Sequence, residues 1–197
     1  MKITSVILVP VWQGWYDKRM SKKLKVIMYP AATLDGFIAD PNGECYSWIN
    51  DEDEAGYTQA IAKAGCVLLG YKTYKQYPED FPPQSGATAF VWTTHDEPDK
   101  ERVRFVRGTP QEVLKQITAA GFSEVIVGGG GEVNGSLAEA GLVDEIIVSV
   151  YSVTLGEGIP LFGSRKPRLQ LTLLETTNKI NGIVKNRYKV IRADHAL

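Results

Sequence analysis

Apolar residues recur along the chain in short runs that end at glycine, proline or polar residues, which is typical of alternating strands and helices. These runs predict strands at residues 24–33, 66–69, 87–93, 102–106, 124–127 and 143–153. Helical patterns occupy residues 51–64, 73–77, 110–120 and 133–140. The third of these helices is expected to begin with Thr109 as N-cap and Pro110 at its first position. Residues 169–177 and 183–191 predict a hairpin that turns at Asn181 and Gly182.

The order of these elements predicts the fold class. Strands alternate with helices up to residue 153 and then follow one another directly. This order favours an α/β domain with a mostly parallel sheet, helices on both faces and an antiparallel C-terminal ribbon at one edge. Residues 20–197 contain neither an internal repeat nor a long linker, so we expect one domain there. Residues 1–19 precede a second possible start at Met20, and we interpret them as an N-terminal extension that adds an edge strand or clasps a neighbouring subunit.

Composition and charge narrow the range of functions. The 197 residues include 22 Lys+Arg and 23 Asp+Glu, so the chain lacks the basic excess typical of nucleic-acid or anionic-membrane binders. Cys45 and Cys66 are too few for a disulfide framework. The short apolar stretch near the N-terminus has no cleavage site, and no run approaches the ~20 residues of a membrane helix. We therefore expect a cytoplasmic protein with a small-molecule ligand, without a metal, a nucleic acid or a membrane as partner.

The strongest local signal is the glycine loop, which comprises Gly128, Gly129, Gly130 and Gly131 between a strand and a helix. Glycines let backbone N–H groups approach a phosphate closely, and a helix N-terminus adds a favourable partial charge. A tight turn explains one or two glycines, whereas four in succession favour anion binding. Because they reduce stability without an evident packing gain, a purely structural role is the least favoured alternative. The spacing differs from the dinucleotide fingerprint of the Rossmann fold.

Two other strand ends are candidates for the rest of a nucleotide site. Gly70 is followed by Lys72 and Thr73, whose ammonium and hydroxyl groups could bind a second phosphate. The alternative for Thr73 is an ordinary helix cap. Thr93 and Thr94 end the following strand and could contact an adenosine ribose or its phosphate.

A substrate pocket is expected beside the end of the first strand and the helix at 51–64. Asp35 and Gly36 follow that strand, as part of a site or as an ordinary turn. Trp48 and Asp53 come next, and Tyr57 lies one helical turn after Asp53. Asp53 could anchor or protonate a heterocycle, and the alternative is an acidic helix start over residues 51–54.

Five segments occur in one order along the chain: 33–39 (TLDGFIA), 69–74 (LGYKTY), 127–134 (VGGGGEVN), 142–145 (LVDE) and 155–163 (LGEGIPLFG). Together they resemble the dihydrofolate-reductase-like family, specifically stand-alone relatives of the reductase domain of riboflavin biosynthesis, over about residues 22–192. The resemblance implies a three-layer fold, a homodimer and NADPH-dependent reduction of a small heterocycle such as 5-amino-6-(5-phosphoribosylamino)uracil. Tyr71 stands where relatives usually carry Arg, which leaves NADH as an alternative cofactor.

The resemblance also implies residue roles. The pyrophosphate would lie against the glycine loop, Glu132 and Val133, and the adenosine ribose would be bound by Gly70, Lys72, Thr73, Thr93 and Thr94. The nicotinamide would lie between Ala32 and Ile38. The substrate would be bound by Trp48 and Tyr57, with Asp35 and Asp53 as catalytic residues. Two alternatives stay open. One is dihydrofolate or pterin reduction with Asp53 relaying a proton, and the other is a non-catalytic nucleotide- or flavin-binding module.

Overall fold

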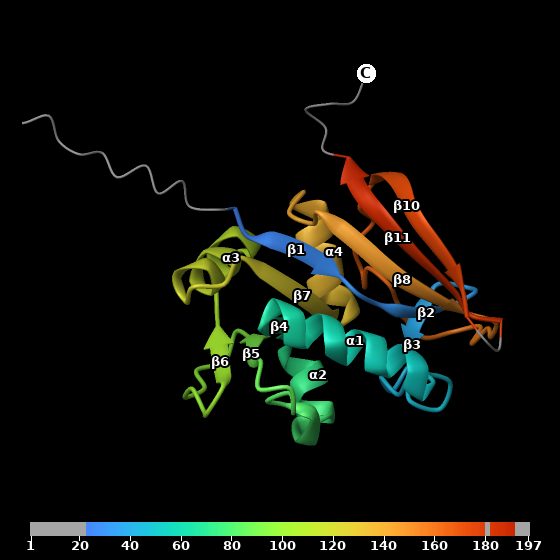
Figure 1. The fold of residues 1–197 in the computed structure, drawn as a ribbon. Helices are drawn as coiled ribbons and strands as arrows, with labels where there is room; N and C mark the ends of the chain where they lie inside the picture. The colour runs from blue at the N-terminus through green and yellow to red at the C-terminus, as the bar shows by residue number, and fades with distance from the viewer. Residues whose placement is uncertain (1–22, 180–181, 192–197) are drawn as a thin grey trace, which may run out of the picture.

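A mixed sheet forms the centre of the computed structural model, which describes residues 23–179 and 182–191 (Figure 1). Its strands lie in the order β10-β11-β8-β1-β7-β4-β5-β6. The parallel part consists of β1 (Lys25–Met28), β4 (Cys66–Gly70), β5 (Thr88–Trp92), β6 (Val103–Val106), β7 (Glu124–Gly129) and β8 (Glu145–Tyr151). β11 (Val184–Ile191) pairs antiparallel with both β8 and the edge strand β10 (Gln170–Asn178). The predicted mostly parallel sheet with a C-terminal antiparallel ribbon is confirmed.

Helices cover both faces of the sheet and create a three-layer arrangement (Figure 1). α1 (Asp51–Ala64) and α2 (Tyr71–Gln76) lie on one face, and α3 (Pro110–Ala119) and α4 (Gly131–Glu139) lie on the other. Side chains along a strand point alternately to the two faces. In β4, Cys66 and Leu68 accordingly pack in the cluster of α3 and α4, whereas Val67 and Leu69 pack in the cluster of α1 and α2.

The first predicted strand is divided in two. Residues 24–33 contain β1 and β2 (Ala31–Thr33), separated at Tyr29 and Pro30, because proline has no N–H group to donate within a sheet. β1 pairs with β7 as far as Met28, whereas β2 pairs with β8. The chain therefore moves away from β7 at Pro30, and the carboxyl ends of β1 and β7 separate there.

Other element boundaries also differ from the expected ones. α2 begins at Tyr71, not Thr73; α4 begins at Gly131, not Val133; and β8 is shorter than residues 143–153. A short 3-10 helix covers Pro78–Asp80. The sequence analysis missed a separate two-stranded sheet, formed by β3 (Phe37–Ala39) and β9 (Ile159–Pro160). Strands of two and three residues are too short to give a periodic signal.

The ends of two predicted elements have different outcomes. α3 begins as expected, with a complete capping box. The Thr109 side chain accepts a hydrogen bond from the Glu112 backbone nitrogen, and the Glu112 carboxylate accepts one from the Thr109 backbone nitrogen. The turn residue Asn181 and the proposed extension at 1–19 lie outside the described residues. Within the described part of the chain, no helix is both long and apolar enough to cross a bilayer.

Candidate active site

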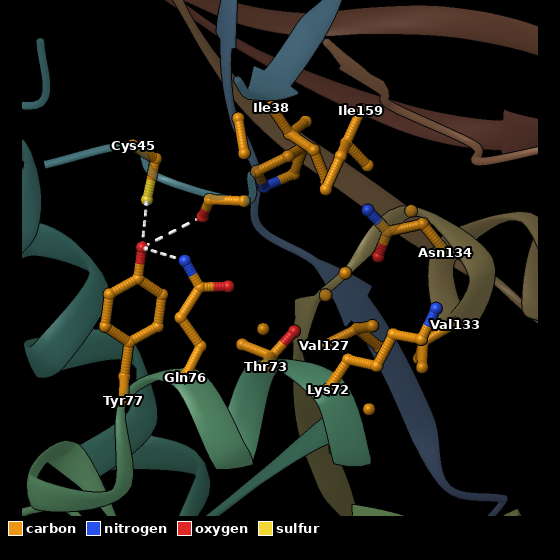
Figure 2. Close-up of a pocket in the computed structure, with 18 of the residues that line it drawn as sticks. Ile38, Cys45, Lys72, Thr73, Gln76, Tyr77, Val127, Val133, Asn134 and Ile159 are labelled. Carbon is orange, nitrogen blue, oxygen red and sulfur yellow. Dashed lines mark hydrogen bonds between the residues drawn. The ribbon is translucent and has the colours of Figure 1, made fainter. Parts of the chain in front are cut away.

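A cleft of about 1130 Å³ opens at the carboxyl ends of β1, β4, β5 and β7. Open α/β sheets bind ligands at this edge, where neighbouring strands diverge. Figure 2 shows Ile38 and Ile159 on one side of the cleft, Lys72 and Thr73 from α2 on another, and Val133 and Asn134 from α4 on a third. The small β3–β9 sheet thus contributes an apolar wall that faces the two helix starts.

The glycine loop lines this cleft, yet its glycines also have local structural causes. Gly129 has φ +94°, a left-handed conformation that favours glycine. A Cβ atom on Gly131 would lie 2.5 Å from the Pro160 carbonyl oxygen and 2.7 Å from the Gly163 nitrogen, and one on Gly128 would overlap the Tyr57 hydroxyl. The expectation that four glycines bring no packing gain is therefore wrong.

The structure brings the second predicted phosphate-binding segment directly against the glycine loop. A Cβ on Gly130 would lie 3.3 Å from Thr73 Oγ1, and one on Gly70 would lie 3.1 Å from Val133 Cγ2. Lys72 is exposed in the first turn of α2 and lines the same cleft. Backbone N–H groups, a hydroxyl and an ammonium group therefore lie together at this end of the cleft.

Glu132 also lines the cleft, but its carboxylate is used within the protein. It accepts hydrogen bonds from the Ser164 backbone nitrogen at 2.7 Å and from Ser164 Oγ at 3.1 Å. These bonds lower the pKa of Glu132, so the group is an anion at neutral pH. A carboxylate repels a phosphate, so the backbone at Glu132, and not its side chain, is suited to bind one.

The strand end at Thr93 and Thr94 forms the third part of the predicted nucleotide site and lines the cleft with His95. Thr93 Oγ1 accepts a hydrogen bond from the His95 backbone nitrogen at 2.9 Å. The His95 ring lies 4.8 Å from the ring of Tyr71, whose hydroxyl donates to Glu97. That hydrogen bond raises the pKa of Tyr71. Tyr71, which the resemblance places where relatives usually carry Arg, is thus neutral, and its hydroxyl already has a hydrogen-bond partner.

Asp53, in the first turn of α1, is 6% exposed and also lines the cleft. Its Oδ1 atom accepts hydrogen bonds from Ser149 Oγ at 2.7 Å and Lys185 Nζ at 2.9 Å. Its Oδ2 atom accepts one from the Tyr151 hydroxyl at 3.3 Å. Burial raises the pKa of Tyr151 to about 12 and therefore keeps this hydroxyl protonated. Asp53 thus lies in the cleft wall, where it could contact a heterocycle as predicted, but its carboxylate also forms a salt bridge with Lys185 that no local pattern indicated.

Tyr57 and Ile38 line the cleft as expected, whereas Ala32, Asp35 and Trp48 are absent from its wall. The position of Ala32 follows from the alternation of side chains along β2. Its neighbour Ala31 faces the cleft, so Ala32 is buried on the other side of the strand. The Trp48 ring packs edge-on against Tyr151, with 5.1 Å between the ring centroids.

Asp35 holds a loop instead of facing a substrate. Its carboxylate accepts hydrogen bonds from Thr33 Oγ1 at 2.5 Å, the Gly156 nitrogen at 2.8 Å and the Leu155 nitrogen at 3.1 Å. These bonds, above all the one from Thr33, lower the pKa of Asp35. The side chain therefore joins the end of β2 to the segment that leads into β9, which is a structural role.

Sequence reasoning also missed the wall formed by Cys45, Gln76 and Tyr77 (Figure 2). The Tyr77 hydroxyl donates to the Gly43 carbonyl oxygen at 2.9 Å and lies 4.0 Å from Cys45 Sγ. Burial raises the pKa of the Cys45 thiol, which makes it a poor nucleophile at neutral pH. Gln76 ends α2 and Tyr77 caps it, whereas Cys45 lies in an irregular loop, so no single periodic pattern marks these residues.

Comparisons with known proteins establish the class. A family model described as the RibD C-terminal domain matches residues 24–185, and the chain belongs to this family. The protein YyaP of Bacillus subtilis (strain 168) is 26% identical over 181 residues, which cover 85% of this chain and 95% of YyaP.

Solved structures share the fold. A putative riboflavin biosynthesis protein from Shewanella sp. PV-4 superposes with a TM-score of 0.74 at 23% identity, covering 86% of this chain and 100% of that one. A diaminohydroxyphosphoribosylaminopyrimidine deaminase/5-amino-6-(5-phosphoribosylamino)uracil reductase from Thermotoga maritima gives 0.71 at 16% identity, over 87% of this chain and 58% of that one. Dihydrofolate reductase from Enterococcus faecalis, complexed with NADP(H), gives 0.69 at 18% identity over 85% and 97%. The predicted dihydrofolate-reductase-like fold is confirmed.

Proposed function

We propose that this protein is an NADPH-dependent reductase of a small pyrimidine or pteridine heterocycle, related in activity to 5-amino-6-(5-phosphoribosylamino)uracil reductase. The observation that carries the proposal is one continuous cleft, whose wall includes the glycine loop, Thr73, Asp53 and Tyr57. A dinucleotide and a ring placed end to end suit such a cleft. Membership of the RibD C-terminal domain family supports a reductase, and the NADP(H) complex of the Enterococcus neighbour supports the cofactor.

The residues present fit a nicotinamide dinucleotide. Gly130 lies beside the Thr73 hydroxyl, and Lys72 lines the same cleft, so a pyrophosphate at the glycine loop would have a hydroxyl donor and a cation nearby. Thr93 and Thr94 suit the adenosine ribose. Bound NADPH would supply the hydride. The chain would bind and orient both ligands, while Ile38 and Ile159 would exclude water from the ring.

Calorimetric titration with NADPH and with NADH tests the cofactor half of the proposal. The variant Gly129→Asp places a carboxylate in the glycine loop and is expected to abolish NADPH binding. Gly141→Asp is the matched control, because Gly141 also has a left-handed φ (+65°) but lies at the end of α4, outside the cleft wall. Loss of binding in both variants, or absence of binding to the folded wild type, would contradict the proposal.

Substrate reduction is tested by following NADPH oxidation with a panel of pyrimidines and pterins. Turnover of any of them supports a reductase, whereas tight NADPH binding without turnover on the whole panel supports the non-catalytic binding module. Among the described residues, no contact of Asp53 favours a pterin over a pyrimidine.

We further propose that the protein acts in the cytoplasm as a homodimer. The edge strand β10 exposes three large apolar side chains, with Leu171 40%, Leu173 53% and Leu174 49% exposed. Unpaired edge strands with exposed apolar side chains are typically covered by another chain. Light scattering should give twice the 21.7 kDa chain mass, and Leu173→Lys should shift the mass toward that of a monomer.

A further inference from the structure

The Asp53–Lys185 salt bridge sets the charge at the substrate end of the cleft. Lys185 Nζ lies 2.9 Å from Asp53 Oδ1, and the two side chains are 16% and 7% exposed. The ammonium group also lies over the Tyr29 ring, 4.6 Å from its centroid. Asp53 and Tyr29 both line the cleft, and the Lys185 ammonium group contacts both of them.

The sheet positions Lys185 for this contact. Lys185 is paired with Ser149 across β11 and β8, and Ser149 Oγ donates to the same Asp53 oxygen. Gly56, one turn along α1, leaves room for the lysine, because a Cβ there would lie 3.2 Å from Lys185 Nζ. Three elements therefore converge on one carboxylate, and the fold holds the pair in place.

Lys185 offsets the charge of Asp53 through this salt bridge. Burial lowers the pKa of Lys185, but hydrogen bonds to Tyr29 and Asp53 outweigh burial and raise it above its ordinary value. Among the described residues, Oδ1 accepts two hydrogen bonds and Oδ2 accepts one, the longer bond from Tyr151. Asp53 can therefore still accept one N–H from a ligand at Oδ2. It cannot form the two parallel charge-assisted bonds with which a free carboxylate binds a protonated aminopyrimidine.

We propose that Lys185 is a specificity-determining residue, which neutralises Asp53 so that the cleft selects an uncharged heterocycle over a cationic one. This inference rests on the proposed function and names the substrate class of the same site. A protonated ring at Oδ2 would lie close to the Lys185 ammonium group in a poorly hydrated wall, where like charges repel strongly. An uncharged ring with an amide N–H meets no such repulsion.

Three other carboxylates line the cleft, those of Glu54, Asp80 and Glu132, and all three are exposed. Glu54 is in the first turn of α1, and Asp80 accepts a 2.6 Å hydrogen bond from the Tyr46 hydroxyl. Water and salt screen exposed charges, so they attract a cation less than a buried carboxylate would. The buried pair therefore dominates selection of the ring.

Binding of 2,4-diaminopyrimidine, which associates with carboxylates as a cation, is compared with binding of uracil, its uncharged counterpart. Ligand-observed NMR gives both affinities, with and without NADPH. Wild type and Lys185→Arg are expected to bind uracil at least tenfold more tightly than 2,4-diaminopyrimidine. Lys185→Met, and Lys185→Gln, which keeps a hydrogen-bond donor, should shift this ratio at least tenfold toward the cation. The double variant Asp53→Asn/Lys185→Met should lose the tighter binding of 2,4-diaminopyrimidine that Lys185→Met gains.

The inference is overturned if wild type binds the cation as tightly as uracil, if neither lysine variant changes the ratio, or if neither probe binds. Failure of the proposed reductase is seen separately. In that case NADPH does not bind the folded wild type, while the ratio of the two pyrimidine affinities still responds to Lys185.

Discussion

Replacing Lys185 with methionine is expected to lower the free energy of unfolding by about 3 kcal/mol, because it leaves the buried Asp53 carboxylate without its cation. At the 2.9 Å separation of Nζ and Oδ1, an effective dielectric constant of about 20 gives an attraction of about 6 kcal/mol. Dehydration of the two groups offsets part of this attraction. In a chain of this size, a loss of about 3 kcal/mol lowers Tm by roughly 6–12 °C.

Urea unfolding of wild type, Lys185→Met, Asp53→Asn and the double variant measures the coupling between the two side chains. The double variant should lose about 2 kcal/mol less than the sum of the single losses, because the second substitution removes a charge that is already unpaired. Additive losses, or a Lys185→Met variant within about 0.5 kcal/mol of wild type, would refute the assignment of a buried, coupled pair.

The same pair predicts a pH dependence of stability. The pKa of Lys185 is raised in the folded protein above its ordinary value of 10.5. The stability that the pair contributes is therefore complete below about pH 10.5 and is lost as pH rises through the folded pKa. The difference between wild type and Lys185→Met should stay constant from neutral pH to about 10 and decrease at higher pH.

Three further predictions concern packing, a helix cap and a loop. Gly131→Ala should destabilise the protein by about 1–3 kcal/mol, since its Cβ would meet backbone atoms of Pro160 and Gly163. Ser136→Ala in the same helix is the control, and equal urea midpoints for the two variants would contradict the packing argument. Thr109→Ala removes the capping box of α3 and should lower the unfolding free energy by about 1 kcal/mol, whereas Thr109→Ser should retain it. Asp35→Asn should speed amide hydrogen exchange at Leu155 and Gly156. Because the folded pKa of Asp35 is lowered, its contribution is present above its unfolded pKa and lost as pH falls through the folded value, so wild type should approach the variant in acid.

The structure brings predicted residues together where a motif joins a strand to a helix. The glycine loop, Gly70, Lys72 and Thr73 meet in one cleft because parallel strands deliver their carboxyl ends to one edge of the sheet. The turn residue Asp35, by contrast, lies outside the cleft wall. Its carboxylate accepts hydrogen bonds from the backbone of Leu155 and Gly156, about 120 residues away in sequence.

Local sequence determined the elements of this protein, because helical and strand periodicity and capping residues act over a few positions. α1 matches its predicted bounds for that reason, with Asn50 as its cap. Tertiary structure alone decided the electrostatics of the substrate end. Lys185 and Asp53 are 132 residues apart, and only the pairing of β11 with β8 places the lysine beside the carboxylate. Strand register and helix docking are cooperative properties of the whole sheet, so a single sequence contains no local signal for that contact.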